Sequence, residues 1–205
     1  MFDDVRILLT ELDKIYKDFF EEWKECSGTP FNLRKKLVID IDNNIELKKY
    51  IFRYREFVNE KIISIMFLLN NINLEKSEVT YRVKAQNSIE FKIDSYIRTH
   101  ESGKIPMNKC LNDMFGIRIV LNDDFEHNHI YDFINLYFPQ CKCINSSKNE
   151  YIATHVYLQE NNYSFPWELQ IWSRENAQNN LDSHKKYKQE YTSWERKLQE
   201  KEVLE

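Results

Sequence analysis

Only three glycines occur in the 205 residues of this chain, at Gly28, Gly103 and Gly116. Glycines so few and so far apart can form neither the GxGxxG fingerprint of dinucleotide-binding folds nor the GxxxxGK[ST] loop of P-loop proteins. Any nucleotide that this protein binds must therefore have its phosphates held by arginine, lysine and serine side chains and a metal ion. This excludes the enzyme classes that hold phosphates in a glycine-rich loop.

A membrane span and an export signal are also missing. The longest nearly unbroken apolar run covers residues 62–69, far short of the roughly 20 residues that a transmembrane helix needs. The chain starts with Met-Phe-Asp-Asp, which is acidic where a signal peptide is basic. We therefore expect a cytoplasmic protein without a membrane partner, whose four cysteines are reduced thiols. Cys141 and Cys143 have no second pair, so a four-ligand zinc site is not expected.

Basic residues are not in excess either. The chain has 29 Lys and Arg and 33 Asp and Glu, which gives a net charge of −4. On average this argues against non-specific binding of nucleic acid. The charge is uneven, however, because residues 31–55 contain seven bases and three acids. This stretch predicts either a local basic face or an ordinary solvated surface. Its bases are Arg34, Lys35, Lys36, Lys48, Lys49, Arg53 and Arg55.

Apolar residues at steps of three and four predict two long helices in the first third of the chain. One covers residues 2–25 and is ended by the Ser-Gly-Thr-Pro sequence that follows it. The other covers roughly residues 44–71. Its expected buried residues are Ile45, Ile51, Phe52, Ile62, Ile63, Met66 and Leu69.

Beyond residue 76 the pattern predicts strands separated by helices. Such an order indicates an α/β (α+β) fold with a mixed β-sheet flanked by helices. We expect an N-terminal helical extension at 1–75, the sheet domain at 76–190 and a short helical tail at 191–205. The expected strands cover residues 79–83, 115–121, 152–158 and 167–172, and the expected helices cover 89–97, 125–137 and 173–200.

Charged side chains on the predicted strands suggest chemistry that depends on a metal ion. Asp113 comes just before one strand, and Glu168 and Gln170 share a face of another, because side chains two apart point the same way. One carboxylate from each of two neighbouring strands, with Arg82 and Lys84 nearby, suits Mg²⁺-dependent phosphoryl transfer. The alternative is a set of ordinary charges on a half-exposed sheet.

Five short segments that carry these residues follow one another along the chain. They are Arg82-x-Lys84-x-x-x-Ser88-x-x-x-Lys92, Asp113-x-x-Gly-Ile-Arg118, Asn149-x-Tyr151-x-x-x-His155, Glu168-x-Gln170 and His184-x-x-Tyr187-Lys188. This series resembles the synthetase domain of the RelA/SpoT family, the enzymes that make (p)ppGpp, over about half of the chain. The resemblance implies a mixed sheet distantly similar to nucleotidyltransferases. It also implies a pyrophosphokinase that transfers the β,γ-pyrophosphate of ATP to a 3′-hydroxyl and releases AMP.

The resemblance implies a role for each matching side chain on the ATP side. Arg82 and Arg118 would clasp the adenine ring, since a guanidinium plane stacks on a π face. Lys84, Ser88 and Lys92 would contact the ATP phosphates, in place of the absent glycine loop.

On the reacting side, the resemblance implies that Asp113 binds Mg²⁺. Glu168 would bind the metal too, or would take the proton from the attacking hydroxyl. Tyr151 would stack on the acceptor base, His155 would lie near the transferred group, and Gln170 would orient Glu168 or the acceptor.

Each role has a structural alternative. From spacing alone, Tyr151 is also explained as a strand aromatic and His155 as a core histidine. Ser88 and Lys92, four residues apart, also fit a polar helix face. We expect His184 to serve packing rather than chemistry.

The acceptor side departs from the family pattern. Around its tyrosine the family typically reads Pro-Lys-x-Asn-Gly-Tyr-x-Ser-x-His, whereas this chain reads Ser-Ser-Lys-Asn-Glu-Tyr-Ile-Ala-Thr-His. The family's glycine is thus Glu150, its serine is Ala153, and the arginine after its glutamine is Trp172. Lys142 and Lys148 are the only cations left in this segment. Because the family's lysines receive the 5′-diphosphate of GDP or GTP, their loss argues against a free guanine nucleotide.

These departures favour the toxic branch of the small alarmone synthetases (toxSAS). Some of its members attach pyrophosphate to the 3′-terminal adenosine of tRNA and stop translation. A tRNA end has no 5′-diphosphate, so the lost lysines would not be needed. Residues 34–55, or Lys185, Lys186 and Lys188, could bind the tRNA backbone. The apolar face of the N-terminal helices could bind an antitoxin.

Two alternatives stay open at this point. One is a (p)ppGpp synthetase that uses GDP or GTP as the acceptor. The other is a protein of a different class, either a catalytically silent nucleotide sensor or a partner-docking protein. The intact Arg82, Asp113 and Glu168 argue against the silent sensor.

Overall fold

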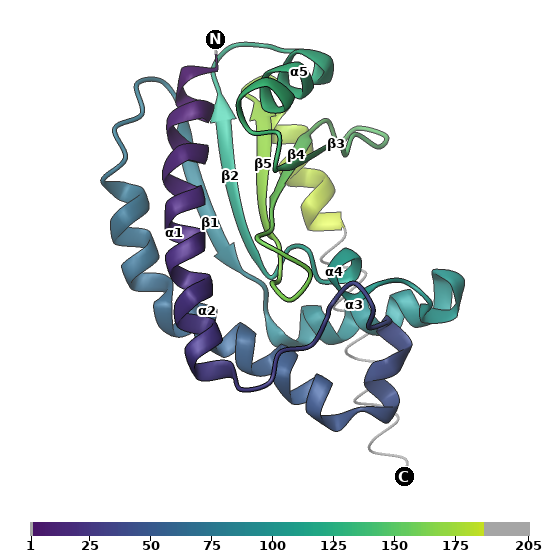
Figure 1. The fold of residues 1–205 in the computed structure, drawn as a ribbon. Coiled ribbons are helices and arrows are strands. Elements are labelled where there is room, and N and C mark those ends of the chain that lie inside the picture. Colours follow the sequence, from purple (N-terminus) through teal and green to yellow (C-terminus); the bar gives the residue numbers. More distant parts are fainter. Residues whose placement is uncertain (1, 187–205) are drawn as a thin grey trace.

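Helices surround one β-sheet in the computed structural model, which describes residues 2–186 (Figure 1). The helices are α1 (Asp3–Ser27), α2 (Ile45–Asn70), α3 (Gln86–Thr99), α4 (Met107–Cys110) and α5 (His127–Tyr137), with 3₁₀ segments at Val38–Asn43 and Glu101–Gly103. The strands are β1 (Glu78–Val83), β2 (Phe115–Leu121), β3 (Lys142–Asn145), β4 (Thr154–Leu158) and β5 (Trp167–Ser173). Residues 177–186 form a further helix.

The sheet is mixed, as the sequence predicted. Its strand order is β1-β2-β5-β4-β3. β2 and β5 are parallel, and the other neighbours are antiparallel. The structure thus confirms the expected mixed sheet with flanking helices. β3 was not predicted, because its four residues are too few for alternation to distinguish a strand from a loop.

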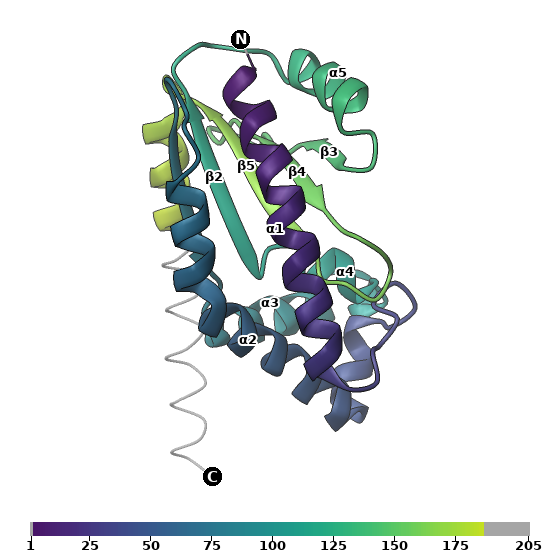
Figure 2. The ribbon, with the colours of Figure 1, turned by 60° about the vertical axis from the view of Figure 1, so that its left-hand side comes forward.

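Helices cover the two faces of this sheet unequally. α1 crosses one face, where the rings of Tyr16 and Phe19 both lie 5.1 Å from Trp167 of β5. Side chains alternate along a strand, so Trp172 points to the opposite face, and it stacks there on His184 of helix 177–186. Figure 2 shows α1 and this C-terminal helix on opposite sides of the sheet.

The apolar face of α1 is buried in the core rather than exposed. Its residues at helical spacing, from Val5 to Trp23, pack against the sheet and α2. The helix ends where Gly28 adopts φ of +76°, a conformation that costs glycine little. The expectation that this face binds an antitoxin is therefore wrong for α1, because the sheet already covers it.

The buried face of α2 differs from the predicted one. Ile51 and Leu69 are buried as expected, but Ile45 and Ile63 are 62% and 75% exposed. The face that packs inward includes two tyrosines, Tyr50 and Tyr54, whose hydroxyls accept hydrogen bonds from the indoles of Trp23 and Trp167. A search for apolar residues at helical spacing overlooks these tyrosines, because tyrosine has a polar hydroxyl. Each is nevertheless buried, since its hydroxyl has a hydrogen-bond partner in the core.

The division of the chain into an extension, a sheet domain and a tail stays a prediction. α1 shares one hydrophobic core with β2 and β5, and the tail at 191–205 lies outside the described residues. Among residues 2–186, none of the helices combines the length and the hydropathy that crossing a membrane requires.

Candidate active site

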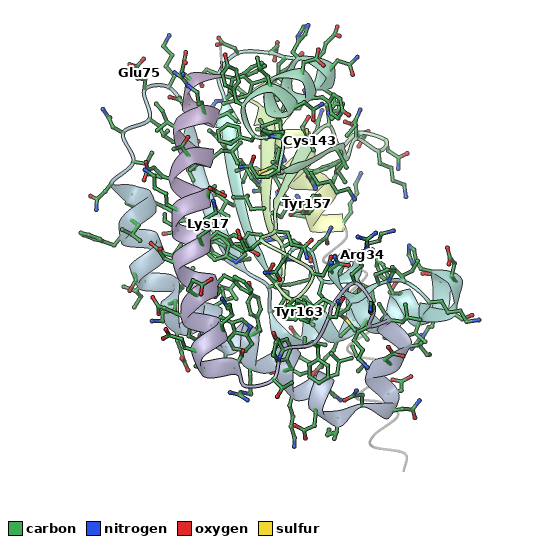
Figure 3. All side chains as sticks on the ribbon, viewed as in Figure 1. Lys17, Arg34, Glu75, Cys143, Tyr157 and Tyr163 are labelled. Carbon is green, nitrogen blue, oxygen red and sulfur yellow. The ribbon has the colours of Figure 1, made fainter. Side chains whose placement is uncertain are left out.

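Positions on all five strands form a row on the sheet face opposite α1. The strand register places Arg82, Gly116 and Glu168 side by side on β1, β2 and β5. It continues through Tyr157 on β4 to Lys142 on β3. Residues directly opposite each other on neighbouring strands point to the same side of a sheet, so these five positions share one face. Figure 3 labels Tyr157 within this sheet.

A chain of hydrogen bonds connects the predicted catalytic residues. The Tyr151 hydroxyl lies 2.8 Å from His155 Nε2, and His155 Nδ1 lies 3.0 Å from Glu168 Oε1. Gln170 Nε2 donates to Glu168 Oε2 at 2.8 Å, and the Arg118 guanidinium donates to Gln170 Oε1 at 3.3 Å. Because the glutamate accepts at Nδ1–H, His155 presents Nε2 as an acceptor toward the tyrosine.

Glu168 is ionised at neutral pH although it is buried. Burial by itself would raise its pKa, but the hydrogen bond from His155 outweighs burial and lowers the pKa. The Tyr157 hydroxyl donates a further hydrogen bond to Glu168 Oε1 at 3.0 Å. A carboxylate of lowered pKa is a weak base, so this geometry suits Glu168 to orienting His155 or binding a cation.

Asp113, directly before β2, lies between two lysines. Lys84 Nζ is 2.6 Å from its Oδ2, and Lys92 Nζ is 2.9 Å from its Oδ1. Burial by itself would raise the pKa of Asp113, but the two ammonium charges hold it well below the usual range. The pKa of Lys84 is lowered, chiefly by burial. Two cations around one anion leave a net positive charge, which fits a phosphate group.

The two carboxylates fit a magnesium ion that arrives with a nucleotide. Within residues 2–186, no three His, Cys, Asp or Glu side chains come together as a protein-only metal site. Mg²⁺, however, usually binds through one or two carboxylates and the substrate phosphates. Gly116 leaves room beside Glu168, because a Cβ there would lie 3.9 Å from Oε2 and 3.7 Å from Arg82. Asp113 and Glu168 as metal ligands stay a prediction.

The remaining residues predicted to bind ATP lie on the same side of the site. Ser88 is in the first turn of α3, and Lys92 follows one turn later. The N-terminus of a helix favours anions. Burial and then the charge of Arg82 lower the pKa of Arg118, so these two guanidinium groups lie close enough to interact electrostatically.

Tyr151 lies in the loop between β3 and β4, which we call the acceptor loop (residues 146–153). Two backbone hydrogen bonds of 2.8 and 3.1 Å join Lys148 and Tyr151 into a tight turn, in which Asn149 has φ of +55°. Burial raises the pKa of Tyr151 to about 12. Its hydroxyl therefore keeps its proton at neutral pH and can donate it to a hydrogen bond.

The cations predicted for the acceptor lie around this loop but not in one cluster. Lys142 occupies the edge strand of the site row, and Lys142 and Lys148 are both exposed. Lys186 Nζ lies 3.6 Å from Glu150 of the acceptor loop, whereas Lys185 pairs with a carboxylate of its own helix. Lys188 lies outside the described residues.

An apolar cluster lies beside Tyr151. It consists of Val120, Ala153 and Trp172, all buried, with Tyr151 packed against them. The Arg118 guanidinium carbon lies 3.6 Å from the centre of the Trp172 ring. Two departures from the family pattern, Ala153 and Trp172, therefore belong to one packing unit.

Sequence reasoning missed two residues of this site. One is Tyr157, which donates a hydrogen bond to Glu168. It comes two residues after His155 on the same strand, so the alternation of side chains would have predicted that Tyr157 and His155 share a face. Asn180 is fully buried and hydrogen-bonded to the backbone of Ile152. No pattern in the sequence marks Asn180, because its partner is a backbone group 28 residues away.

His184 packs against the acceptor side. Its ring stacks on Trp172 with centroids 5.7 Å apart and meets Tyr151 edge-on at 5.4 Å. Burial, and then the charges of Arg82 and Arg118, lower its pKa to about 4. The imidazole is therefore neutral at neutral pH.

Acid should destabilise the protein through His184. The unfolded chain takes up the imidazole proton near pH 6.5 and the folded chain near pH 4, so the free energy of unfolding should fall as the pH drops through this range. Over this pH range, the free energy of unfolding of a His184→Gln variant should fall by about 1–2 kcal/mol less than that of the wild type. This figure allows for the partial solvent exposure of His184. Urea denaturation of both proteins at several pH values tests this. Parallel stability curves would contradict the prediction.

Comparisons with known proteins agree with this geometry. Residues 81–192 match the family model described as "Region found in RelA / SpoT proteins". No curated protein sequence matches the chain.

Solved structures similar to this chain include alarmone synthetases. The small alarmone synthetase 1 from Bacillus subtilis is 18% identical over 72% of this chain and 82% of that chain, with a TM-score of 0.41. The same protein bound to its product pppGpp is 19% identical over 73% and 83%, with a TM-score of 0.40. A GTP pyrophosphokinase family protein from Streptococcus pneumoniae is 18% identical over 73% and 78%, with a TM-score of 0.42.

The family match extends over more than half of the chain. It includes β2 to β5 and every residue of the hydrogen-bonded chain from Tyr151 to Arg118. The chain therefore belongs to the RelA/SpoT family, and it is a pyrophosphokinase of that type.

Proposed function

We propose that this enzyme transfers the β,γ-pyrophosphate of ATP to the 3′-hydroxyl of the terminal adenosine of tRNA and acts as a toxin that stops translation. The acceptor oxygen attacks the β-phosphorus of ATP and forms a new P–O bond. The bond between that phosphorus and the oxygen bridging it to the α-phosphate breaks, and AMP leaves. The proton of the hydroxyl passes to a base in the site.

The apolar cluster on the acceptor side is the observation that carries this choice of acceptor. Val120, Ala153 and Trp172 are buried beside Tyr151, where the family pattern has a serine and an arginine in place of the last two. Because Trp172 stands where the family has an arginine, one cation that could pair with a 5′-diphosphate is missing, and Glu150 on the acceptor loop would repel a diphosphate. The terminal adenosine of tRNA carries no 5′-diphosphate, so it needs no such cation and suits this site better than GDP or GTP does.

Cations for the tRNA backbone lie next to the acceptor loop. Lys186 reaches Glu150 on that loop, Lys148 is an exposed residue of the loop itself, and Lys185 is exposed on the same helix as Lys186. The basic stretch at residues 34–55 is divided in the structure, since its α2 part lines a separate cavity of about 730 Å³ between α1 and α2. We therefore favour the lysines of helix 177–186 as the tRNA contact.

On the donor side, the positive cluster around Asp113 supports binding of the ATP phosphates. Lys84 and Lys92 would contact the phosphates together with Ser88, and Arg82 and Arg118 would hold the adenine. Charge neutralisation on the phosphate oxygens is the chemistry that Mg²⁺ would supply when bound at the two carboxylates.

For the proton of the attacking hydroxyl, the hydrogen-bonded chain supports His155 as the base. The Glu168 carboxylate accepts a hydrogen bond from His155 Nδ1–H. The other ring nitrogen of His155, Nε2, then carries a lone pair that can accept a proton. Tyr151, which now occupies Nε2, would turn toward the acceptor base, and Gln170 would keep Glu168 in place.

A label-transfer assay tests the proposed acceptor. The enzyme is incubated with Mg²⁺ and γ-labelled ATP, and with either deacylated tRNA or GDP and GTP. We expect label on tRNA, and none on tRNA whose terminal ribose has been oxidised with periodate, because the oxidised end lacks the 3′-hydroxyl. The Asp113→Ala variant should label nothing.

The remaining outcomes contradict the proposal in different ways. Label on the guanine nucleotide alone would establish a (p)ppGpp synthetase, the second candidate that family membership supports. Label on neither acceptor would point to the silent nucleotide-binding alternative.

A translation toxin requires a neutralising partner, and α2 offers the surface for it. Ile63, Phe67 and Leu68 are exposed on this helix, whereas the apolar face of α1 is buried. We place the antitoxin on these α2 residues, and we place both proteins in the cytoplasm, where tRNA is charged.

A further inference from the structure

One buried amide joins the acceptor loop to the C-terminal helix. Asn180, in helix 177–186, is fully buried. Its Oδ1 accepts from the backbone N–H of Ile152 at 2.8 Å, and its Nδ2 donates to the carbonyl of Ile152, also at 2.8 Å. Since one bond needs an acceptor and the other needs a donor, the backbone determines the orientation of the amide. A flipped amide would place two donors together.

This amide takes the place of a strand partner for Ile152. β4 pairs with β5 with Thr154 opposite Ile171, and the same antiparallel register would place Ile152 opposite Ser173, where β5 ends. The pairing of β4 with β5, however, stops at Thr154 and Ile171 and does not reach Ile152. The Asn180 side chain presents a carbonyl and an N–H as a peptide group does, so it satisfies both backbone groups of Ile152.

The two hydrogen bonds of Asn180 lie next to Tyr151, the residue that we expect to contact the acceptor. Ile152 directly follows Tyr151, whose hydroxyl binds His155. The Ile152 side chain is 48% exposed, so apolar packing holds this residue weakly. The same helix carries Lys186, which reaches Glu150 on the other side of Tyr151.

We propose that Asn180 is a positioning residue for the acceptor, which holds the acceptor loop so that Tyr151 and Lys186 approach the acceptor as one unit. This inference rests on the proposed function, because it takes Tyr151 as an acceptor contact. Asn180 touches no reacting atom and acts through Ile152.

The test compares Asn180→Ala with Asn179→Ala, an exposed neighbour in the same helix. Steady-state kinetics are measured with whichever acceptor the wild type labels, tRNA or guanine nucleotide. For Asn180→Ala we expect the KM of the acceptor to rise at least tenfold and the KM of ATP to change less than twofold. Asn179→Ala should change neither. Equal increases in both KM values would mean general loosening of the fold and would overturn the proposal.

A second measurement does not depend on activity. Amide hydrogen exchange, followed by mass spectrometry, compares peptides that cover residues 146–153 and 167–173. In Asn180→Ala the acceptor loop should exchange at least tenfold faster, while β5 exchanges at the wild-type rate. Unchanged exchange in the loop, or equal acceleration in both peptides, would overturn the proposal. If only the proposed function is wrong, the wild-type enzyme labels no acceptor, whereas the acceptor loop of Asn180→Ala still exchanges faster than that of the wild type.

Discussion

Asp113→Asn is expected to lower pyrophosphate transfer by at least about a thousandfold and to destabilise the fold at the same time. Asp113 is buried between the ammonium groups of Lys84 and Lys92. Without its charge, two buried cations face each other unpaired, and breaking a buried pair in this way costs about 3–5 kcal/mol. With one carboxylate oxygen replaced by an amide NH₂, the metal ion that accompanies ATP would also lose the anionic ligand that we predict for it.

Kinetics and urea denaturation of the same preparation separate the two effects. The matched control is Asp94→Asn, since Asp94 pairs with Arg98 on the surface of α3, where an ion pair contributes at most about 1 kcal/mol. Circular dichroism at low temperature shows that the variant is folded when assayed. A folded Asp113→Asn protein that keeps a tenth of wild-type activity would remove Asp113 from the catalytic site.

Glu168→Gln should be the most selective catalytic lesion, with a loss of transfer of about 10²–10⁴-fold. The glutamine has nearly the same shape but no charge, and its amide must present donors where the carboxylate only accepts. Tyr157, His155 and Gln170 all direct hydrogen bonds at this carboxylate. One of them then meets a donor, which costs about 1–3 kcal/mol of stability.

The measurement is kcat against KM for both substrates. We expect kcat to fall while the KM of ATP changes little, because the contacts to adenine and phosphate are predicted at other residues. Glu175→Gln, at an exposed position shortly after β5, is the matched control and should behave as the wild type. A Glu168→Gln enzyme whose only defect is a raised KM would show that Glu168 binds substrate and takes no part in the chemical step.

The contrast between α1 and α2 shows where local pattern predicts burial and where it does not. In α1 the residues from Val5 to Trp23 repeat at helical spacing, and nearly all of that stripe is buried. In α2 the apolar residues lie all round the helix, and the core takes up Tyr50 and Tyr54 while Ile63 stays exposed. The choice of face in α2 depends on the indole groups that bind the tyrosine hydroxyls, and these lie on other elements.

Sequence alone determined most of the elements and the family resemblance. Periods of two and of 3.6 residues are local properties, so every strand except β3 and both long N-terminal helices were predictable from neighbouring residues. The same holds for the order of the segments that contain Asp113, Glu168 and Tyr151, which carried the family resemblance.

The tertiary structure decided which of these residues act together. Strand register, set by hydrogen bonds between segments far apart in the chain, places His155 beside Glu168. Packing of α3 into the core brings Lys92, together with Lys84, to Asp113. Packing likewise joins Ala153 and Trp172 in one cluster. The bonds of Asn180 to Ile152 have no local pattern, because a side-chain amide can satisfy any backbone group that the fold brings within reach.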